Sequence, residues 1–250
     1  MLKKKVGIHL NKEEAIICIS APQEHGTHTQ SLRYTSLETL ANKLQSALKN
    51  NNQYSCNVTL SEDQTHKKRL TLEKKWSHKK AHNFISNNID KILKQDKNGV
   101  SFYINVFYTE NTTQINLYYT SIKRINDIQI LMQKMKINCK SILPIESRLI
   151  DSLPWHQRSR QCIFIMPGKK IYAYKDAALI CNVTAMSKDS ITEIERIFIK
   201  KKRVHIYAFH HNKNFDFFGE NQIKNRKWHQ LPRSLLLTNQ NHWEAIVAYG

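Results

Sequence analysis

Long apolar runs are missing from this 250-residue sequence, and no stretch approaches the roughly 20 apolar residues that cross a bilayer. The basic start, "MLKKKVGIHL", is not followed by an apolar segment long enough for a secretory signal. Repeats and low-complexity tracts are also absent, while hydrophobic residues make up 40% and aromatic residues 9% of the chain. We therefore expect a soluble, folded protein with one large domain or two small ones.

Acidic residues are scarce: 20 Asp and Glu face 39 Lys and Arg, which gives a formal net charge of +19. One interpretation is attraction to polyanions such as nucleic acid or an anionic membrane face. The other is AT-rich coding, because Lys, Asn and Ile are all abundant and Lys far outnumbers Arg, the residue expected where bidentate phosphate contacts matter. Charge alone does not decide between them.

Cysteine pairs of the CxxC type are absent as well. The five cysteines are widely separated and lie in strand-like apolar surroundings, as expected for reduced, buried thiols of a cytoplasmic protein. They are Cys18, Cys56, Cys139, Cys162 and Cys181.

The first part of the chain predicts a β-β-β-α-β order. A hairpin over 6–20 and a strand over 31–36 precede a helix over 36–50, for which Ser36 is a good N-cap and leucines recur at helical spacing. The segment 55–61 reads as a short buried strand.

A second block, about 66–145, predicts a β-α-β-β-α-β order. It contains a strand over 69–72, an amphipathic helix over 77–95 and a hairpin of two alternating segments over 101–121. A helix capped by Ser121 and a strand over 137–146 complete it. We expect this block to form a compact module of its own.

The remainder predicts a second domain over 156–250, after a first domain over 1–155. Three strands over 162–183, a helix over 189–202 and a strand over 203–209 are expected. A polar loop then runs from 210 to 233, before a strand over 234–239 and a closing helix over 241–250 that packs back near the cleft.

This order resembles the actin-like ATPase superfamily, an α/β, ribonuclease H-like two-domain fold, here with an inserted β-α-β-β-α-β module. The insertion resembles the PilM family of type IV pilus assembly proteins, including the HofM-like members linked to competence and DNA uptake. Three segments carry the likeness: "NVTLS" (57–61), "KINCKSILPIESRLIDSL" (136–153) and "HWEAIVAYG" (242–250). The likeness covers almost the whole chain and depends on order and spacing more than on signature residues.

The residues of the nucleotide cleft depart from the pattern that the resemblance implies. Where the family has Asp and Gly in the first phosphate hairpin, this chain has His9 and Asn11, and imidazole cannot replace a carboxylate in organising hydrated Mg²⁺. The second hairpin offers Met166 and Gly168 without an acid, and Phe209 stands where an adenine-side glycine is expected. We predict a degenerate ATPase without cofactor; a weak ATP-binding protein is the alternative.

Other groups of residues are weaker candidates for a functional site. His78 and His82 are four residues apart on one predicted helix, but no acid or cysteine lies close in sequence to complete a zinc site, so no metal is expected. No nucleophile sits on a glycine-flanked elbow. The aromatic residues of the 101–121 hairpin resemble a base-stacking platform, which keeps a basic nucleic-acid-binding protein as a further alternative.

The resemblance implies a non-catalytic cytoplasmic adaptor at the inner membrane. In the family, the N-terminal segment of a bitopic partner, PilN, docks as an extended peptide between the first domain and the inserted module. An anionic membrane surface is a second expected contact, and no small-molecule substrate is expected. The candidate partner-binding residues are Val58, Leu60, Phe84, Tyr103 and Tyr118.

Overall fold

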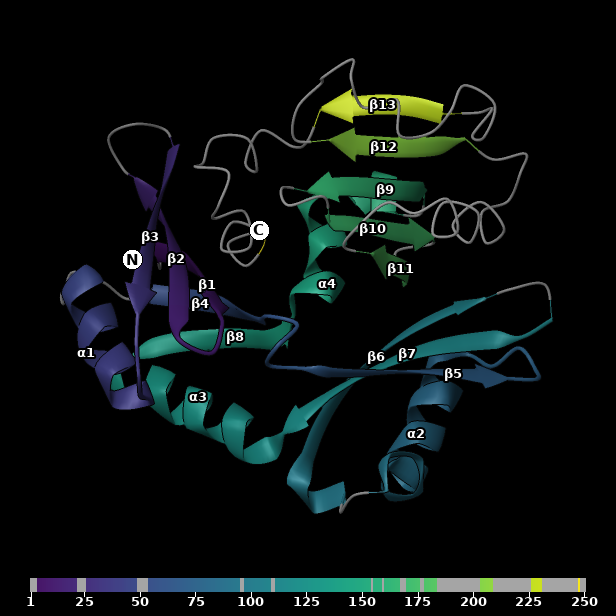
Figure 1. Cartoon of the computed structure of the whole chain (residues 1–250), viewed down its shortest axis with the longest axis horizontal. Coiled ribbons are helices and arrows are strands. Elements are labelled where there is room, and N and C mark those ends of the chain that lie inside the picture. Colours follow the sequence, from purple (N-terminus) through teal and green to yellow (C-terminus); the bar gives the residue numbers. More distant parts are fainter. Residues whose placement is uncertain are drawn as a thin grey trace.

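The computed structural model contains three β-sheets with helices beside them (Figure 1). It describes residues 4–21, 26–48, 54–94, 97–108, 111–153, 155–158, 160–166, 170–175, 178–183, 203–208, 226–230 and Val247.

The first sheet has five strands in the order β3-β2-β1-β4-β8. Its central strand β1 pairs antiparallel with β2 and parallel with β4, and β4 pairs parallel with β8. The strands and the first helix are β1 (Lys4–Leu10), β2 (Glu14–Ala21), β3 (Gly26–Arg33), α1 (Leu37–Ala47), β4 (Tyr54–Leu60) and β8 (Ile137–Pro144).

One face of this sheet is covered by α1 and by α3 (Ile122–Lys134). Alternate β1 residues Val6, Ile8 and Leu10 are fully buried there, because successive side chains of a strand point to opposite faces. The α1 helix begins at the predicted N-cap. The Ser36 hydroxyl accepts a hydrogen bond from the Thr39 N–H, and the Thr39 hydroxyl accepts one from the Ser36 N–H.

A second, three-stranded sheet forms the inserted module, with the order β5-β7-β6. Helix α2 covers one face, and its apolar side (Ala81, Ile85 and Ile89) packs on the sheet. Ser77 caps α2 through the Lys80 N–H, at the predicted start. The elements are β5 (His66–Leu72), α2 (His78–Leu93), a short 3₁₀ turn (Lys97–Gly99), β6 (Val100–Tyr108) and β7 (Thr113–Ser121).

The inserted module covers fewer residues than the predicted 66–145 block, because the last strand of that block belongs to the first sheet. Strand β8 pairs with β4 of the first sheet, and α3 buries Ile128, Leu131 and Met132 in the first sheet's core. The elements of the block form as predicted, but its last helix and strand pack with the first domain. Sequence order alone could not show this, because an apolar strand can pair with either sheet.

A connector of short helices leads to the third sheet, whose five strands have the order β11-β10-β9-β12-β13. Strand β9 pairs antiparallel with β10 and parallel with β12, just as β1 pairs with β2 and β4, so the second domain repeats the plan of the first. The elements are α4 (Ile145–Arg148), a 3₁₀ turn (Leu149–Ser152), α5 (Trp155–Arg158), β9 (Gln161–Met166), β10 (Lys170–Lys175), β11 (Ala178–Val183), β12 (Val204–Ala208) and β13 (Arg226–Gln230).

Strand β13 corrects one prediction. It lies within the segment 210–233 that the sequence predicted as polar loop, and it pairs parallel with β12. Its sequence, RKWHQ, has a single strongly apolar residue, so no alternation marked it as a strand. The predicted helix over 189–202 and strand over 234–239 lie wholly outside the described residues, as does the closing helix except for Val247.

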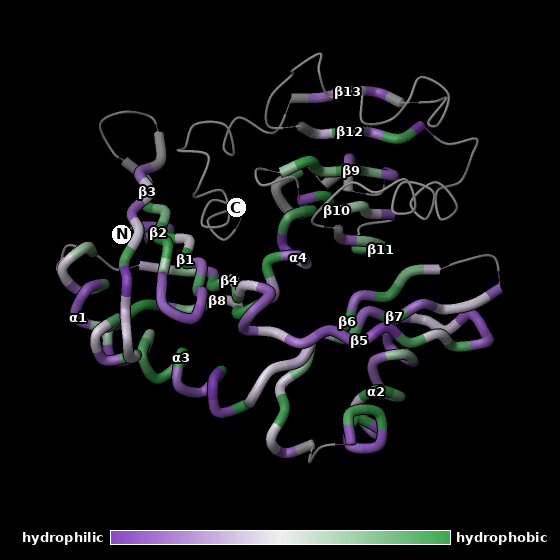
Figure 2. Tube along the Cα trace, in the orientation of Figure 1, coloured by the Kyte–Doolittle hydropathy of each residue, from purple (hydrophilic) through white to green (hydrophobic). Residues whose placement is uncertain are grey.

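The three sheets share one apolar core. It joins Ile16 and Cys18 of β2, Tyr118 of β7, the connector residue Leu149 and Phe164 of β9. Figure 2 shows hydrophobic and hydrophilic residues alternating along β7 and around α3, as expected for elements with one buried face. Among the described helices, none is long and apolar enough to cross a membrane.

Candidate functional site

The β1–β2 turn is closed by backbone hydrogen bonds. The Asn11 N–H donates to the Glu14 carbonyl at 2.8 Å, and the Tyr34 hydroxyl donates to the Asn11 carbonyl at 2.5 Å. Asn11 therefore serves the turn through its main chain, and this fixes the hairpin's end against β3.

His9 points into the molecule. It is 3% exposed, and its Nδ1 is hydrogen-bonded to Thr59 Oγ1 of the neighbouring strand β4 at 3.0 Å. Burial, the largest cause, lowers the pKa of His9 to about 4. The imidazole is therefore neutral at physiological pH, and it does not offer the positive charge with which a protonated histidine could meet a phosphate.

The first hairpin carries Glu13 and Glu14 at its own turn, and a further carboxylate reaches it from the segment after β4. The Lys12 N–H donates to Asp63 Oδ2 at 3.3 Å, and the Ser61 N–H donates to the Leu10 carbonyl at 3.0 Å. Because β1 and β4 are parallel, their carboxyl ends meet at one edge of the sheet, where open α/β sheets bind ligands. Glu62 and Asp63 were not predicted as site residues, although they come directly after the buried strand β4.

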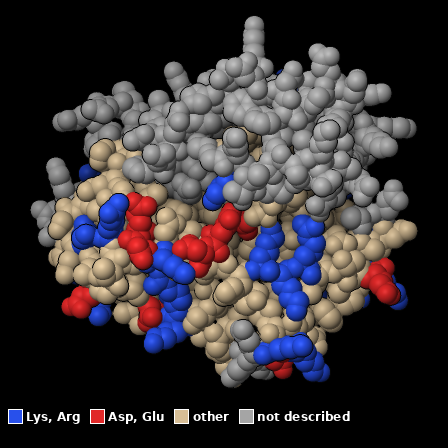
Figure 3. Space-filling model, viewed as in Figure 1, with Lys and Arg blue, Asp and Glu red and all other residues tan. Residues whose placement is uncertain are grey.

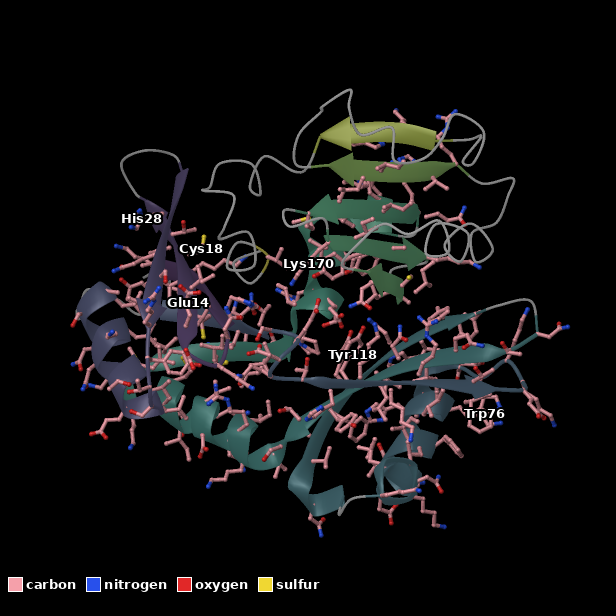
Figure 4. All side chains as sticks on the ribbon, in the orientation of Figure 1. Glu14, Cys18, His28, Trp76, Tyr118 and Lys170 are labelled. Carbon is pink, nitrogen blue, oxygen red and sulfur yellow. The ribbon has the colours of Figure 1, made fainter. Side chains whose placement is uncertain are left out.

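These residues line an open pocket of about 850 Å³ between the first hairpin and the start of β10. Both signs of charge alternate around it, and Figure 4 shows Glu14 and Lys170 on the two sides. Figure 3 shows acidic side chains next to basic ones across this face. The lining residues are Asn11, Lys12, Glu13, Glu14, Arg33, Ser61, Glu62, Asp63 and Lys170.

The pocket can hold a charged group through Lys12, Arg33 or Lys170, but it lacks a compact carboxylate cluster. Within the described part of the chain, no group of three His, Cys, Asp or Glu side chains is placed to bind a metal ion. Of the predicted second-hairpin residues, Met166 is buried in the shared core, whereas Gly168 and Phe209 lie outside the described residues.

A second polar cluster, the polar junction, lies where the three sheets meet. Its centre is Glu146 of α4, 4% exposed, which is 3.9 Å from Lys67 Nζ of β5 and accepts from Asn182 Nδ2 of β11. Lys67 Nζ also donates to Asn182 Oδ1 at 2.8 Å. Burial raises the pKa of Glu146, and Lys67 opposes this rise; burial also lowers the pKa of Lys67.

Further side chains extend the polar junction between the module and the second domain. Arg69 donates to the Ile180 carbonyl and Asn116 to the Leu179 carbonyl, both on β11. The Tyr172 hydroxyl donates to Glu62 Oε1 at 3.2 Å, which links this cluster to the pocket. We define the polar junction by Lys67, Arg69, Asn116, Glu146 and Asn182. It ties the module to both domains.

The predicted partner-binding residues are not all brought together. Val58 and Leu60 are buried in the first sheet's core, and Tyr118 is 1% exposed in the shared core. The Tyr103 ring is half-buried beside it, with ring centroids 6.3 Å apart. Phe84 lies on the opposite face of the module, against Trp76. Strand alternation predicted which residues share a face but not which faces other elements cover; their role in partner binding stays a prediction.

The packing of the module also concerns the two other candidate sites, the base-stacking platform and the histidine pair. Phe107 and Tyr118 are buried on the face toward the second domain, while Phe102 and Tyr119 pack on the α2 side, so the hairpin does not form an open stacking platform. His82 lies beside the Phe102 ring, with ring centroids 5.5 Å apart.

Comparisons with known proteins give structural matches alone. No protein-family model matches the sequence, and no curated protein matches it significantly. A PilM–PilN type IV pilus biogenesis complex is similar in structure, with a TM-score of 0.55, 6% identity and coverage of 98% of this chain and 97% of that one. The cytoplasmic domain of EpsL, an inner-membrane component of the type II secretion system of Vibrio cholerae, matches with a TM-score of 0.52, 10% identity and coverage of 98% and 94%.

These matches and the repeated strand plan define the class of fold. The chain has the actin-like two-domain fold with an inserted module. Within that class, it is PilM-like in structure over nearly its full length.

Proposed function

We propose that this chain is a non-catalytic adaptor of a type IV pilus, competence or related secretion assembly. It docks the cytoplasmic N-terminal tail of a bitopic, PilN-like inner-membrane protein and is peripheral at that membrane. The observation that carries the proposal is the match to the PilM–PilN complex, which covers 98% of this chain and 97% of that one. The match to the EpsL cytoplasmic domain supports a membrane-proximal assembly.

An extended peptide docks best where a strand edge offers backbone donors and acceptors beside apolar side chains. Strand β8 is an outer strand of the first sheet, and its residues Ile142 and Leu143 are half-buried. Tyr103, also half-buried, lies on the outer strand β6 of the module, and α3 contacts both strands. We place the tail between β8 and β6, beside Ile142 and Tyr103.

Two observations favour an adaptor over an enzyme. His9 is neutral and buried against Thr59, and the carboxylates near the first hairpin do not form a metal-binding group among the described residues. Hydrolysis in such a cleft requires Mg²⁺ held against the phosphates and a polarised water. The pocket of about 850 Å³ supports weak ATP binding as the second candidate, because cations from both domains line it.

The test is a titration with a peptide from the N-terminus of a bitopic protein encoded immediately downstream. Amide chemical shifts should move within 56–144 and stay largely constant in β9–β11, because the tail contacts the first domain and the module. Ile142→Asp should weaken binding at least tenfold, whereas Ile130→Asp, a matched change at an exposed isoleucine of α3, should not. Shifts that cluster in the second domain, or equal effects of the two variants, would reject the proposed docking edge.

A further inference from the structure

The connection from β5 to α2 concentrates lysines around a tryptophan. Residues 74–80 read KKWSHKK, and all four lysines are exposed. Tyr108, 39% exposed, lies beside them at the end of β6. We call this surface the basic–aromatic tip and define it by Lys74, Lys75, Trp76, Lys79, Lys80 and Tyr108. Figure 4 shows Trp76 on the module, at the side of the molecule away from the first sheet.

The tip is fixed in place by the module. The Trp76 N–H donates to Thr113 Oγ1 at 2.7 Å, and that hydroxyl donates to the Lys74 carbonyl at 2.8 Å. The Tyr108 hydroxyl donates to the Trp76 carbonyl at 2.9 Å. The half-buried Trp76 ring stands edge-on to Phe84, with ring centroids 5.2 Å apart. The lysines are therefore presented on an ordered surface.

Contacts within the described residues do not offset the positive charge of Lys74, Lys75 and Lys79. The first turn of α2 contains His78, Lys79 and Lys80 and no acidic residue, although the helix dipole favours negative charge at this end. Among the described residues, none of the four lysines forms an ion pair with a carboxylate. Lys80 lies over the Trp76 ring, with Nζ 4.7 Å from the centroid. An external anion would offset the mutual repulsion of these charges.

The chemistry of the tip distinguishes between two kinds of polyanion. All its cations are lysines, which act as compact point charges and do not read phosphates or bases in a bidentate way. Trp and Tyr, with an apolar body and a polar edge, concentrate at the headgroup level of bilayers. A base-stacking site needs open ring faces, whereas Trp76 is half-buried and has Lys80 over its ring.

We propose that the basic–aromatic tip is the surface through which this protein contacts anionic phospholipid. The inference deepens the proposed function, since it rests on a chain that acts at the inner membrane, and it assigns that contact to one end of the module. The tip lies on the α2 side of the module, whereas the proposed tail-docking edge is at β8 and β6.

The test compares two variants of the full chain with equal net charge. One replaces the four tip lysines by Gln (Lys74→Gln, Lys75→Gln, Lys79→Gln and Lys80→Gln). The control replaces four exposed lysines elsewhere on α2 and α3 (Lys91→Gln, Lys94→Gln, Lys123→Gln and Lys134→Gln). Lys91 and Lys94 lie at the far end of α2, roughly 20 Å from the tip, which exceeds the screening length of about 8 Å at physiological salt.

Binding is measured by co-sedimentation with vesicles of phosphatidylglycerol and phosphatidylethanolamine at 150 mM salt, with phosphatidylcholine vesicles as the neutral control. Each lysine near an anionic surface strengthens binding up to about fivefold, so the tip variant should bind more than twentyfold less tightly. The control variant should change less than threefold. Equal losses in both variants would show that net charge alone drives binding and would overturn the proposal.

Two further measurements separate the alternatives. Lipids brominated near the headgroup should quench tryptophan fluorescence of the wild-type chain, and Trp76→Phe, which keeps a ring against Phe84, should remove most of that quenching. Persisting quenching would contradict the proposal. Tip-dependent binding to a short DNA duplex without vesicle binding would replace lipid with nucleic acid. A wild-type chain that binds the tail peptide but not the anionic vesicles refutes the tip alone, whereas one that binds the vesicles through the tip but not the peptide refutes the adaptor.

Discussion

The ion pair at the polar junction supports a quantitative prediction about how the three sheets hold together. Removing one partner of a fully buried ion pair typically costs about 3–5 kcal/mol, because the other charge is left desolvated. Here the atoms are 3.9 Å apart and the Lys67 side chain is 26% exposed, so solvent weakens the effect. We expect Lys67→Met to lower the free energy of unfolding by about 2 kcal/mol.

The partner substitution and the double variant complete the cycle. In Glu146→Gln, the amide still accepts from Asn182 and Lys67 keeps its bond to the Asn182 oxygen, so the loss should be about 1 kcal/mol. The variant that carries both changes has no buried charge at this position. It should unfold within about 1 kcal/mol of the wild type, since neutral replacement of a buried pair is often tolerated.

The pH dependence gives an independent check. Burial raises the pKa of Glu146, and loss of Lys67, which opposes the rise, should raise it further. A raised folded-state pKa means that the native chain holds the proton over a pH window in which the unfolded chain has released it, so stability falls as pH rises from about 4.5 through that window. The cost of Lys67→Met should therefore be full at pH 7.5 and shrink towards pH 4.

Urea unfolding of the four chains at both pH values measures these differences. Losses that add to about 3 kcal/mol in the double variant, or a Lys67→Met variant as stable as the wild type at pH 7.5, would refute the coupling between Lys67 and Glu146.

Three more predictions test the first domain. Mg-ATP at physiological salt should raise the melting temperature no more than inorganic triphosphate does; metal-dependent stabilisation by ATP alone would restore the weak ATP-binding alternative. His9 has a folded-state pKa of about 4 against an ordinary 6.5, so its contribution is present above pH 6.5 and is lost as pH falls towards 4. This pKa shift corresponds to roughly 3 kcal/mol of folding stability. The urea midpoint of His9→Leu should therefore fall less between pH 7.5 and pH 4.5 than the wild-type midpoint does, and equal falls in both chains would contradict the prediction. Cys139 is half-buried, and a hydrogen bond from Cys56 lowers its pKa, so it should be the first thiol alkylated by iodoacetamide in the native chain. Mass spectrometry identifies the site, and earlier modification of Cys18 would be the contrary result.

Local signals in the sequence predicted most individual elements. Ser36 caps α1 as predicted, because a hydroxyl before an apolar period satisfies the first free N–H groups. Ser121 stands at the predicted N-cap of α3, but its side chain makes no capping hydrogen bond. Strand pairing between segments that are distant in the sequence could not be predicted from such local signals. The strand over 137–144 has the same apolar character whether it joins the module or the first sheet, and only three-dimensional packing of α3 places it beside β4.

The candidate site shows the same limit. The departure at His9 could be read directly, since residue type alone excludes a carboxylate there. The acids Glu62 and Asp63 were missed because their approach to the first hairpin depends on parallel pairing over 50 residues of separation. The burial of Val58 and Tyr118 depends on elements that cover their strands, which alternation does not specify.

The polar junction has a mechanical consequence. Among the described residues, the backbone passes from the first domain to the second at the connector that contains Glu146. Side-chain bonds from β5 and β7 to β11 add a second link on the other side of that crossing, so module, connector and second domain form a closed ring. Separating the module from the second domain therefore requires these side-chain bonds to break, even while the connector stays intact.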